Sequence, residues 1–232
     1  MSELAGQTIL VTGAKGGLGA HVTQAFLDAG AKVIGSSRAI QDADFPNANF
    51  AAMPADLTDA DAARQLVAGV LSRFQKLDAL IHVMGGFAGG QPIPETDDAT
   101  WDRMMNLNLR AAFNTLRAVI PAMRQAGRGR IVAIGSRAGV EPAANIGAYN
   151  ASKAGLVALV RTAALENKDL GITANVILPG TMNTEANRKA DAGADQSKWI
   201  DPRRVAGLTV FLASDAAAQI TGAAIPVYGQ EL

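Results

Sequence analysis

Short apolar runs rich in β-branched residues recur along the chain, and each is bounded by glycine, proline or polar residues. A run that is apolar at nearly every position is typical of a strand buried on both faces of a parallel sheet. Such runs predict strands at residues 8–11, 31–36, 49–53, 77–83, 130–134, 172–178 and 223–228.

Apolar side chains at helical spacing occupy most of the segments between these runs, which predicts amphipathic helices there. The predicted helices cover residues 18–30, 59–74, 99–125, 149–166 and 201–213. Asp59 and Asp201 are good N-caps, and Pro202 suits a first helical position. Because strands and helices alternate without a break in composition, we expect one α/β domain over residues 1–232. Its doubly wound parallel sheet, of the Rossmann type, would have about seven strands with helices on both faces.

Composition excludes several classes of protein. The chain has 232 residues, 49% of them hydrophobic, and its 21 basic residues balance 21 acidic ones, so nothing favours nucleic acid or an anionic membrane surface. It has no Cys and only two His, so a metal site built on those ligands is not expected. No apolar run reaches the ~18 residues of a membrane span. We therefore expect a cytoplasmic protein with a small-molecule ligand.

A glycine-rich turn, with Gly13, Gly16, Gly17 and Gly19, separates the first predicted strand from the first helix. Strand, glycine turn and helix follow in the order that a dinucleotide site needs, because glycines let the backbone approach a pyrophosphate at a helix N-terminus. The same glycines could instead serve only a tight turn between strand and helix.

Arg38 follows the second predicted strand, and the first acidic residue after that strand is Asp42. An acid at this position would bind the ribose 2′-hydroxyl of NAD, whereas an arginine accommodates the 2′-phosphate of NADP. The sequence therefore favours NADP, with NAD as the less favoured cofactor. An exposed arginine without a ligand is the alternative.

Tyr149 and Lys153 are four residues apart in a predicted helix, which places both side chains on one face. A nearby ammonium group lowers the pKa of a phenol, so this pair could carry out proton transfer. The alternative is a packed ring beside a solvated charge.

Four other polar residues lie where chemistry is possible. Asn106 and Asn108 are mildly unfavourable inside a helix, so function could explain them. Ser136 follows the fifth predicted strand, where it could form a turn or point a hydroxyl into a ligand crevice. His82 is a catalytic candidate because an ordinary histidine titrates near neutrality, but its position in a strand favours a packed core histidine.

Over nearly its whole length the chain resembles the compact, single-domain type of the short-chain dehydrogenase/reductase family. The segment from Thr12 to Gly19 matches the family's Thr-Gly-x-x-x-Gly-x-Gly turn. The resemblance implies a catalytic tetrad of Asn108, Ser136, Tyr149 and Lys153. It also implies cofactor binding by Gly13, Lys15, Gly17, Leu18, Gly19, Arg38, Asp56, Leu57, Gly85, Tyr149, Lys153, Pro179, Gly180, Thr181 and Thr184. Two segments depart from the family pattern: residues 82–85 read His-Val-Met-Gly instead of Asn-Asn-Ala-Gly, and residues 228–230 read Tyr-Gly-Gln instead of Asp-Gly-Gly.

The family likeness implies an NAD(P)-dependent oxidoreductase that interconverts a carbonyl and a secondary alcohol. Tyr149 would be the general acid or base, Lys153 would lower its pKa and hold the nicotinamide ribose, Ser136 would bind the substrate oxygen, and Asn108 would anchor a water. The likeness also implies a homotetramer, or a homodimer. The segments expected to select the substrate are the loop after residue 85, residues 137–146, and a mobile lid over residues 181–200.

Two other functions are compatible with the sequence. One is an NADP-sensing regulator without turnover, although the complete tetrad argues against it. The other is pteridine reduction, because residues 84–90 are similar to the glycine-rich tract of dihydropteridine reductases.

Overall fold

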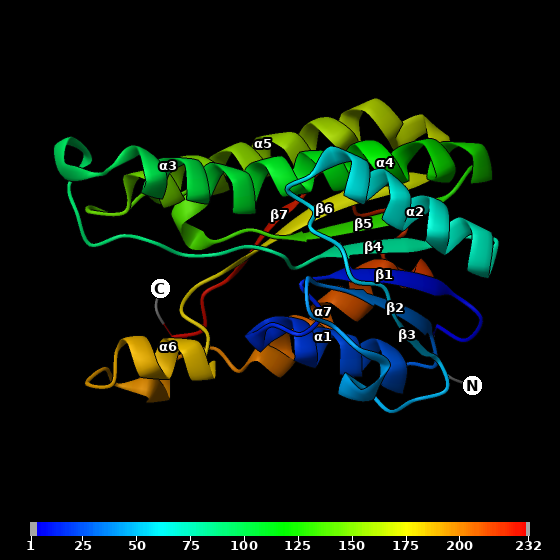
Figure 1. Cartoon of the computed structure of the whole chain (residues 1–232), viewed down its shortest axis with the longest axis horizontal. Helices are drawn as coiled ribbons and strands as arrows, with labels where there is room; N and C mark the ends of the chain where they lie inside the picture. The colour runs from blue at the N-terminus through cyan, green and yellow to red at the C-terminus, as the bar shows by residue number, and fades with distance from the viewer. Residues whose placement is uncertain (1–3, 231–232) are drawn as a thin grey trace.

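Seven parallel strands form one sheet at the centre of the molecule, in the order β3-β2-β1-β4-β5-β6-β7 (Figure 1). The structure, a computed structural model, describes residues 4–230. The strands are β1 Thr8–Thr12, β2 Lys32–Ser36, β3 Phe50–Ala52, β4 Ala79–His82, β5 Gly129–Ile134, β6 Ile172–Pro179 and β7 Ala224–Val227. The predicted doubly wound, Rossmann-type sheet is therefore confirmed.

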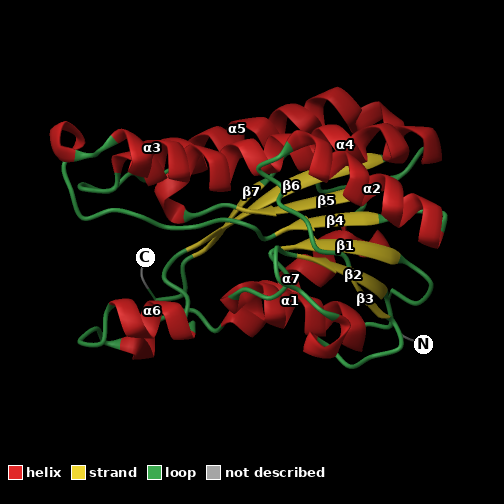
Figure 2. Cartoon of the chain, viewed as in Figure 1, coloured by secondary structure: helices red, strands yellow, loops and turns green. Residues whose placement is uncertain are grey.

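Helices cover both faces of this sheet (Figure 2). One layer consists of α1 (Gly17–Asp28) and α7 (Pro202–Ala213). The opposite layer consists of α2 (Ala60–Phe74), α4 (Ala111–Ala126) and α5 (Gly147–Asn167). Two further helices, α3 (Asp98–Met105) and α6 (Glu185–Ala190), extend beyond the sheet on its two sides.

The core is divided by the sheet into two clusters of fully buried side chains. Leu10, Leu80 and Ile131 point toward the α2, α4 and α5 layer, whereas Ile9 and Ile81 point toward α1 and α7. Adjacent strand residues thus supply opposite faces, which explains why the strand sequences are apolar at almost every position.

Side-chain caps begin two of the helices as the sequence predicts. The Asp59 carboxylate accepts hydrogen bonds from the backbone N–H groups of residues 61 and 62, and Asp201 accepts one from that of residue 203. Pro202 occupies the first turn of α7. Each cap satisfies backbone donors that lack partners inside the helix.

The long helix expected over residues 99–125 is interrupted by a π-helical segment, Asn106–Arg110, between α3 and α4. The apolar periodicity continues through this segment, so that periodicity did not predict the wider turn. Asn108 is fully buried at its centre and bonds outside the helix. π-Helical turns of this kind are frequent at functional sites.

Strands β1 and β4 are neighbours, and the chain crosses away from them in opposite directions along the sheet. In open α/β sheets, ligands bind at the carboxyl ends of the strands where the order reverses in this way. The glycine turn after β1 and the glycine-rich loop after β4 both begin at this edge. Among residues 4–230, no helix is long and apolar enough to cross a membrane, and no group of potential metal ligands is assembled.

Candidate functional site

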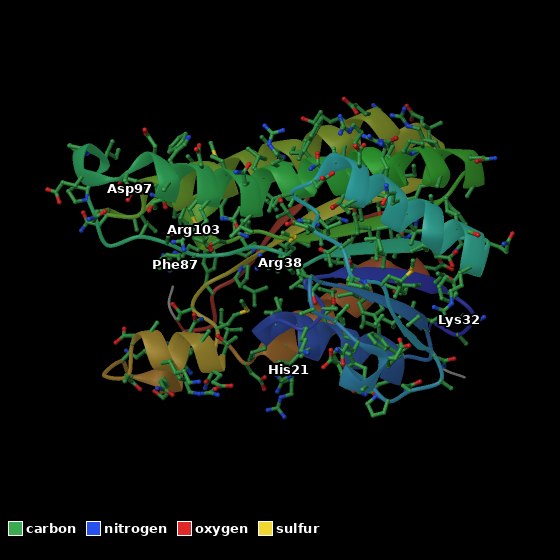
Figure 3. All side chains as sticks on the ribbon, in the orientation of Figure 1. His21, Lys32, Arg38, Phe87, Asp97 and Arg103 are labelled. Atoms are coloured by element: carbon green, nitrogen blue, oxygen red, sulfur yellow. The ribbon has the colours of Figure 1, made fainter. Side chains whose placement is uncertain are left out.

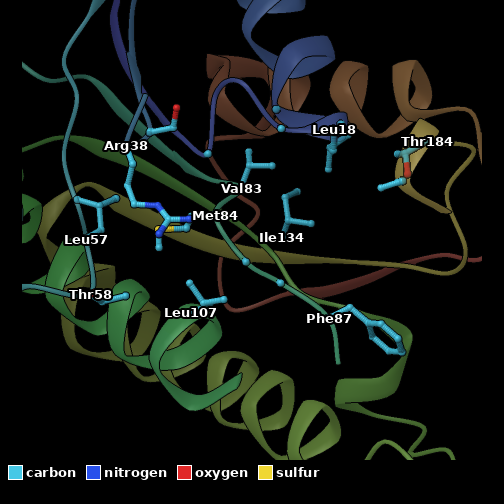
Figure 4. A pocket seen from close by; sticks show the side chains of 18 of the residues that line it. Leu18, Arg38, Leu57, Thr58, Val83, Met84, Phe87, Leu107, Ile134 and Thr184 are labelled. Atoms are coloured by element: carbon cyan, nitrogen blue, oxygen red, sulfur yellow. The ribbon is translucent and has the colours of Figure 1, made fainter. Parts of the chain in front are cut away.

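A cavity of about 960 Å³ opens at the carboxyl ends of the central strands (Figure 4). The predicted site residues that line it are Gly13, Gly17, Leu18, Gly19, Arg38, Asp56, Leu57, Gly85, Tyr149, Lys153 and Thr184. They come from the segments that follow β1, β2, β3, β4 and β6, and from α5. The fold therefore gathers segments distant in sequence around one space.

The glycine turn allows three segments to meet at the floor of this cavity. Gly13 has a φ of +66°, and a Cβ there would lie 2.8 Å from the backbone nitrogen of Met84. A Cβ on Gly19 would overlap the carbonyl oxygen of Gly13. At Gly17 a Cβ would come within 3.2 Å of Thr184, so the segment after β6 packs over the turn. These glycines thus make the tight strand-to-helix turn and also line the cavity.

The end of β2 presents polar groups to the same cavity. The Ser36 hydroxyl is buried and has no hydrogen-bond partner among the described residues, which is costly unless a ligand supplies one. Arg38 is exposed and points its guanidinium group into the cavity (Figure 4). Hydrogen bonds from the Thr58 hydroxyl and backbone N–H, with a smaller effect of the Arg38 charge, hold the pKa of Asp56 below its usual value.

The structure places four of the predicted cofactor residues outside the cavity lining. The Lys15 ammonium pairs with the Asp44 carboxylate at 2.7 Å and also donates to the carbonyl of residue 39. Pro179 is the last residue of β6, and Gly180 donates its backbone N–H to residue 227. Thr181 bonds through its carbonyl to the backbone of residue 200.

Tyr149, Ser136 and Lys153 come together at the end of β5. The Tyr149 and Ser136 side chains form a hydrogen bond with each other. Ser136 also caps a short 3-10 turn by accepting from the backbone N–H of residue 138 at 3.2 Å. Lys153 is 5% exposed, lies over the Tyr149 ring with its nitrogen 5.9 Å from the centroid, and donates to the carbonyl of Ile134 at 3.0 Å. Three of the four tetrad residues predicted from the family resemblance therefore share one location.

The expected lowering of the Tyr149 pKa by Lys153 is wrong for this structure. Burial raises the pKa of the Tyr149 phenol, and the hydrogen bond from Ser136 offsets only part of this rise. Burial also lowers the pKa of Lys153 to about 8. The Lys153 ammonium group lies beside the face of the ring rather than against the hydroxyl. Its charge therefore does not set the direction of the pKa shift of the phenol.

Asn108 is held behind the cavity lining by hydrogen bonds to the loop after β4 and to α5. Its carbonyl oxygen accepts from the backbone N–H of Gly86 at 2.9 Å, and its amide nitrogen donates to the Gly86 carbonyl and to the Ser152 hydroxyl, each at 3.0 Å. Gly85 packs so closely that an added Cβ would lie 2.8 Å from the Asn108 oxygen and 3.3 Å from the Lys153 nitrogen. Asn108 therefore fixes the loop after β4 next to Lys153.

His82 is a buried core histidine, as its position in a strand predicted. Its Nδ1 lies 3.0 Å from the Thr12 hydroxyl oxygen, which also accepts from the backbone N–H of Met84 at 3.3 Å. Burial and then the Lys153 charge lower the pKa of His82 to about 3, so the ring is neutral. His82 thereby links β1 to β4 just before the loop that forms the cavity floor.

Phe87, Arg103 and Ser152 belong to the site but were not identified from the sequence. The Phe87 ring packs edge-on against Tyr149, with centroids 5.0 Å apart. Arg103 lines the cavity one helical turn before Leu107, which also lines it. Helical spacing from Asn108 and Leu107 could have indicated Arg103, whereas nothing near Ser152 revealed its bond to Asn108.

Known proteins resemble the chain over almost its full length. A family model described as short chain dehydrogenase matches residues 7–195. Short-chain dehydrogenase/reductase olcF of Penicillium canescens is 34% identical over 250 residues, which cover 98% of this chain and 97% of that protein. The 2,5-dichloro-2,5-cyclohexadiene-1,4-diol dehydrogenase LinX of Sphingobium indicum is 33% identical over 243 residues, with the same coverage. The crystal structure of gox2181 matches with a TM-score of 0.91 at 28% identity and covers 98% of this chain and 96% of its own.

Proposed function

Because this chain belongs to the short-chain dehydrogenase/reductase family, whose members are NAD(P)-dependent dehydrogenases of small molecules, we propose that it interconverts a carbonyl and a secondary alcohol. Tyr149 is the general acid or base of the proposed reaction. The observation that carries the proposal is the hydrogen-bonded Tyr149 and Ser136 pair beside the buried Lys153, at the wall of the cavity.

The cavity residues fit a dinucleotide. The Gly13, Gly17 and Gly19 backbone leaves room for a pyrophosphate next to the N-terminus of α1, and the unpartnered Ser36 hydroxyl suits a polar ligand atom at the end of β2. When bound, the nicotinamide supplies or accepts the hydride. The chain's own residues bind and orient it and handle the proton.

We further propose that NADP(H) is preferred over NAD(H). Arg38 presents its guanidinium group to the cavity, and this group can pair with a 2′-phosphate through charge-assisted hydrogen bonds. The end of β2 carries Ser36 and Ser37 in place of the acid that would select a ribose 2′-hydroxyl.

Each tetrad residue has a role in the proposed reaction. The raised pKa of Tyr149 keeps its proton in place at neutral pH, so the phenol can protonate the oxygen of a carbonyl as that carbonyl is reduced. Ser136 donates a hydrogen bond to the same oxygen and fixes its position. With a pKa of about 8, Lys153 is still mostly protonated at neutral pH and can return a proton to Tyr149. Asn108 positions the Gly86 loop, and its proposed water anchor remains a prediction.

A homotetramer, or a homodimer, in the cytoplasm is part of the proposal. Phe113 on α4 is 42% exposed and Leu165 on α5 is 71% exposed, and a second subunit packed on these helices would cover such apolar side chains. Helices α4 and α5 would then form the contact between subunits.

Replacing Tyr149 with Phe tests the proposed role, because the variant keeps the ring contact with Phe87 and loses only the hydroxyl. We expect turnover of a carbonyl panel with NADPH to fall by about 10²- to 10⁴-fold, the usual contribution of a general acid. Binding of NADPH, followed by fluorescence, should change little. Near-wild-type turnover in this variant would contradict the proposed role of Tyr149.

A further inference from the structure

A second cavity, of about 270 Å³, adjoins the main one between the loop after β4, α3 and the start of α5. Its lining residues are Phe87, Ala88, Gly89, Gln91, Thr96, Thr100, Arg103, Asn145, Ile146, Gly147 and Ala148. Phe87 and Arg103 line both cavities, so the two spaces meet at these side chains. Figure 3 shows both residues on the α3 side of the molecule, away from His21 and Lys32.

Arg103 is the only charged residue among those that line the second cavity. Within residues 4–230, no carboxylate lies within ion-pair distance of its guanidinium group. Asp97 caps α3 by accepting from the Thr100 backbone N–H at 2.7 Å and from the Thr100 hydroxyl, and the Arg103 charge has only a smaller effect on its lowered pKa. The Asp97 carboxylate is therefore occupied as the N-cap of α3. The guanidinium group of Arg103 keeps its hydrogen-bond donors available for a ligand.

The other residues around this cavity also suit an anion. Gln91, Thr100 and Asn145 provide neutral polar side chains, and no acidic side chain is among the lining. Ile146, at the N-cap of the 21-residue helix α5, gives no side-chain cap to the backbone N–H groups that follow it. The positive end of the helix dipole thus adds to the field of the Arg103 charge.

Phe87 connects this anion-favouring space to the reacting groups. Its ring contacts Tyr149 edge-on and is 65% exposed, so it forms a wall between the Tyr149 hydroxyl region and the second cavity. A ligand whose carbonyl oxygen lies at Tyr149 and Ser136 can extend past Phe87 toward Arg103. Phe87 and Arg103 line the main cavity as well as the second cavity. The apolar middle of such a ligand would pack on the aromatic ring.

We propose that the substrate is an oxo acid or the corresponding hydroxy acid, whose carboxylate binds Arg103 in the second cavity while its carbonyl lies at Tyr149. This inference rests on the proposed oxidoreductase function. Arg103 is then a specificity-determining residue that binds the substrate away from the reacting carbon. A carboxylate matches the guanidinium group in shape and charge, because the two groups can form paired hydrogen bonds.

The test compares a series of oxo acids with their methyl esters, which keep the reacting carbonyl but remove the negative charge. With wild-type enzyme and NADPH, we expect kcat/KM for at least one acid to exceed that for its ester by about 10- to 100-fold. Arg103→Gln should remove this difference, mainly by raising KM for the acid, and Arg103→Lys should restore part of it. Lys32→Gln, which removes a positive charge at the far end of the molecule, should leave the ratio unchanged.

Calorimetric binding of the same acids to the NADPH-bound protein gives a readout that does not depend on turnover. We expect binding that Arg103→Gln weakens by a similar factor. The inference would be overturned if the esters were reduced with the same kcat/KM as their acids, or if wild type and Arg103→Gln bound the acids equally tightly. Either result would leave the oxidoreductase function intact. Absence of turnover with every carbonyl tested would contradict the proposed function, and the calorimetry would still decide whether Arg103 binds the acid.

Discussion

His82 should make the protein less stable in mild acid. The ring is 1% exposed in β4, and its pKa of about 3 lies far below the ordinary value of 6.5. The unfolded chain binds a proton at this residue below pH 6.5, whereas the folded chain does not until about pH 3, so stability falls as the pH falls through that window. The slope is about 1.4 kcal/mol per pH unit, which gives about 2 kcal/mol between pH 7 and pH 5.

Urea unfolding at pH 7 and pH 5 measures this loss directly. In His82→Asn, which cannot titrate in this range, the loss between the two pH values should be smaller by about 2 kcal/mol, whatever the variant's stability at pH 7. His21→Asn is the matched control, because His21 is exposed on α1, and it should behave as wild type. Equal pH dependence of His82→Asn and wild type would refute the idea that a buried neutral histidine is maintained here.

Three further changes probe the cavity and the sheet. Arg38→Ala should raise the Kd for NADPH by about 10- to 100-fold and leave that for NADH nearly unchanged, as fluorescence titration would show. Gly19→Ala should abolish cofactor binding or folding, because the added Cβ would overlap the Gly13 carbonyl oxygen. In the control Gly207→Ala the added Cβ enters open space, so its melting temperature should be close to that of wild type. Asp78→Ala should lower the free energy of unfolding by about 2–3 kcal/mol, because its buried carboxylate accepts from the backbone at the start of β1, with cofactor affinity unchanged.

Most of the fold could be predicted because the information is local. A buried parallel strand must be apolar on both faces, so the strands could be recognised without any knowledge of their neighbours. Caps such as Asp59 and Asp201 act within one helical turn and are equally visible. The π-helical segment at Asn106–Arg110 was missed because it depends on Asn108 bonding to a loop more than 20 residues away in sequence.

The site was predictable in its residue types but not in its contacts. Spacing and family likeness predicted Tyr149, Lys153 and Ser136 as site residues, and the structure brings their side chains together. They did not give the direction of the Tyr149 pKa shift, because burial depends on how the Phe87 loop folds over the ring. The pairing of Lys15 with Asp44 is likewise a tertiary contact that the glycine motif does not encode.

Transfer of a labelled hydride from the cofactor to a carbonyl would demonstrate the proposed reaction itself. NADPH deuterated at the transferred position of C4 is incubated with the protein and a carbonyl panel that includes oxo acids, and the products are analysed by mass spectrometry. We expect an alcohol with deuterium on the carbon that bears the new hydroxyl, and loss of this product in Tyr149→Phe. Binding of NADPH without any labelled alcohol from the whole panel would contradict the proposed reaction and would favour a cofactor-sensing protein.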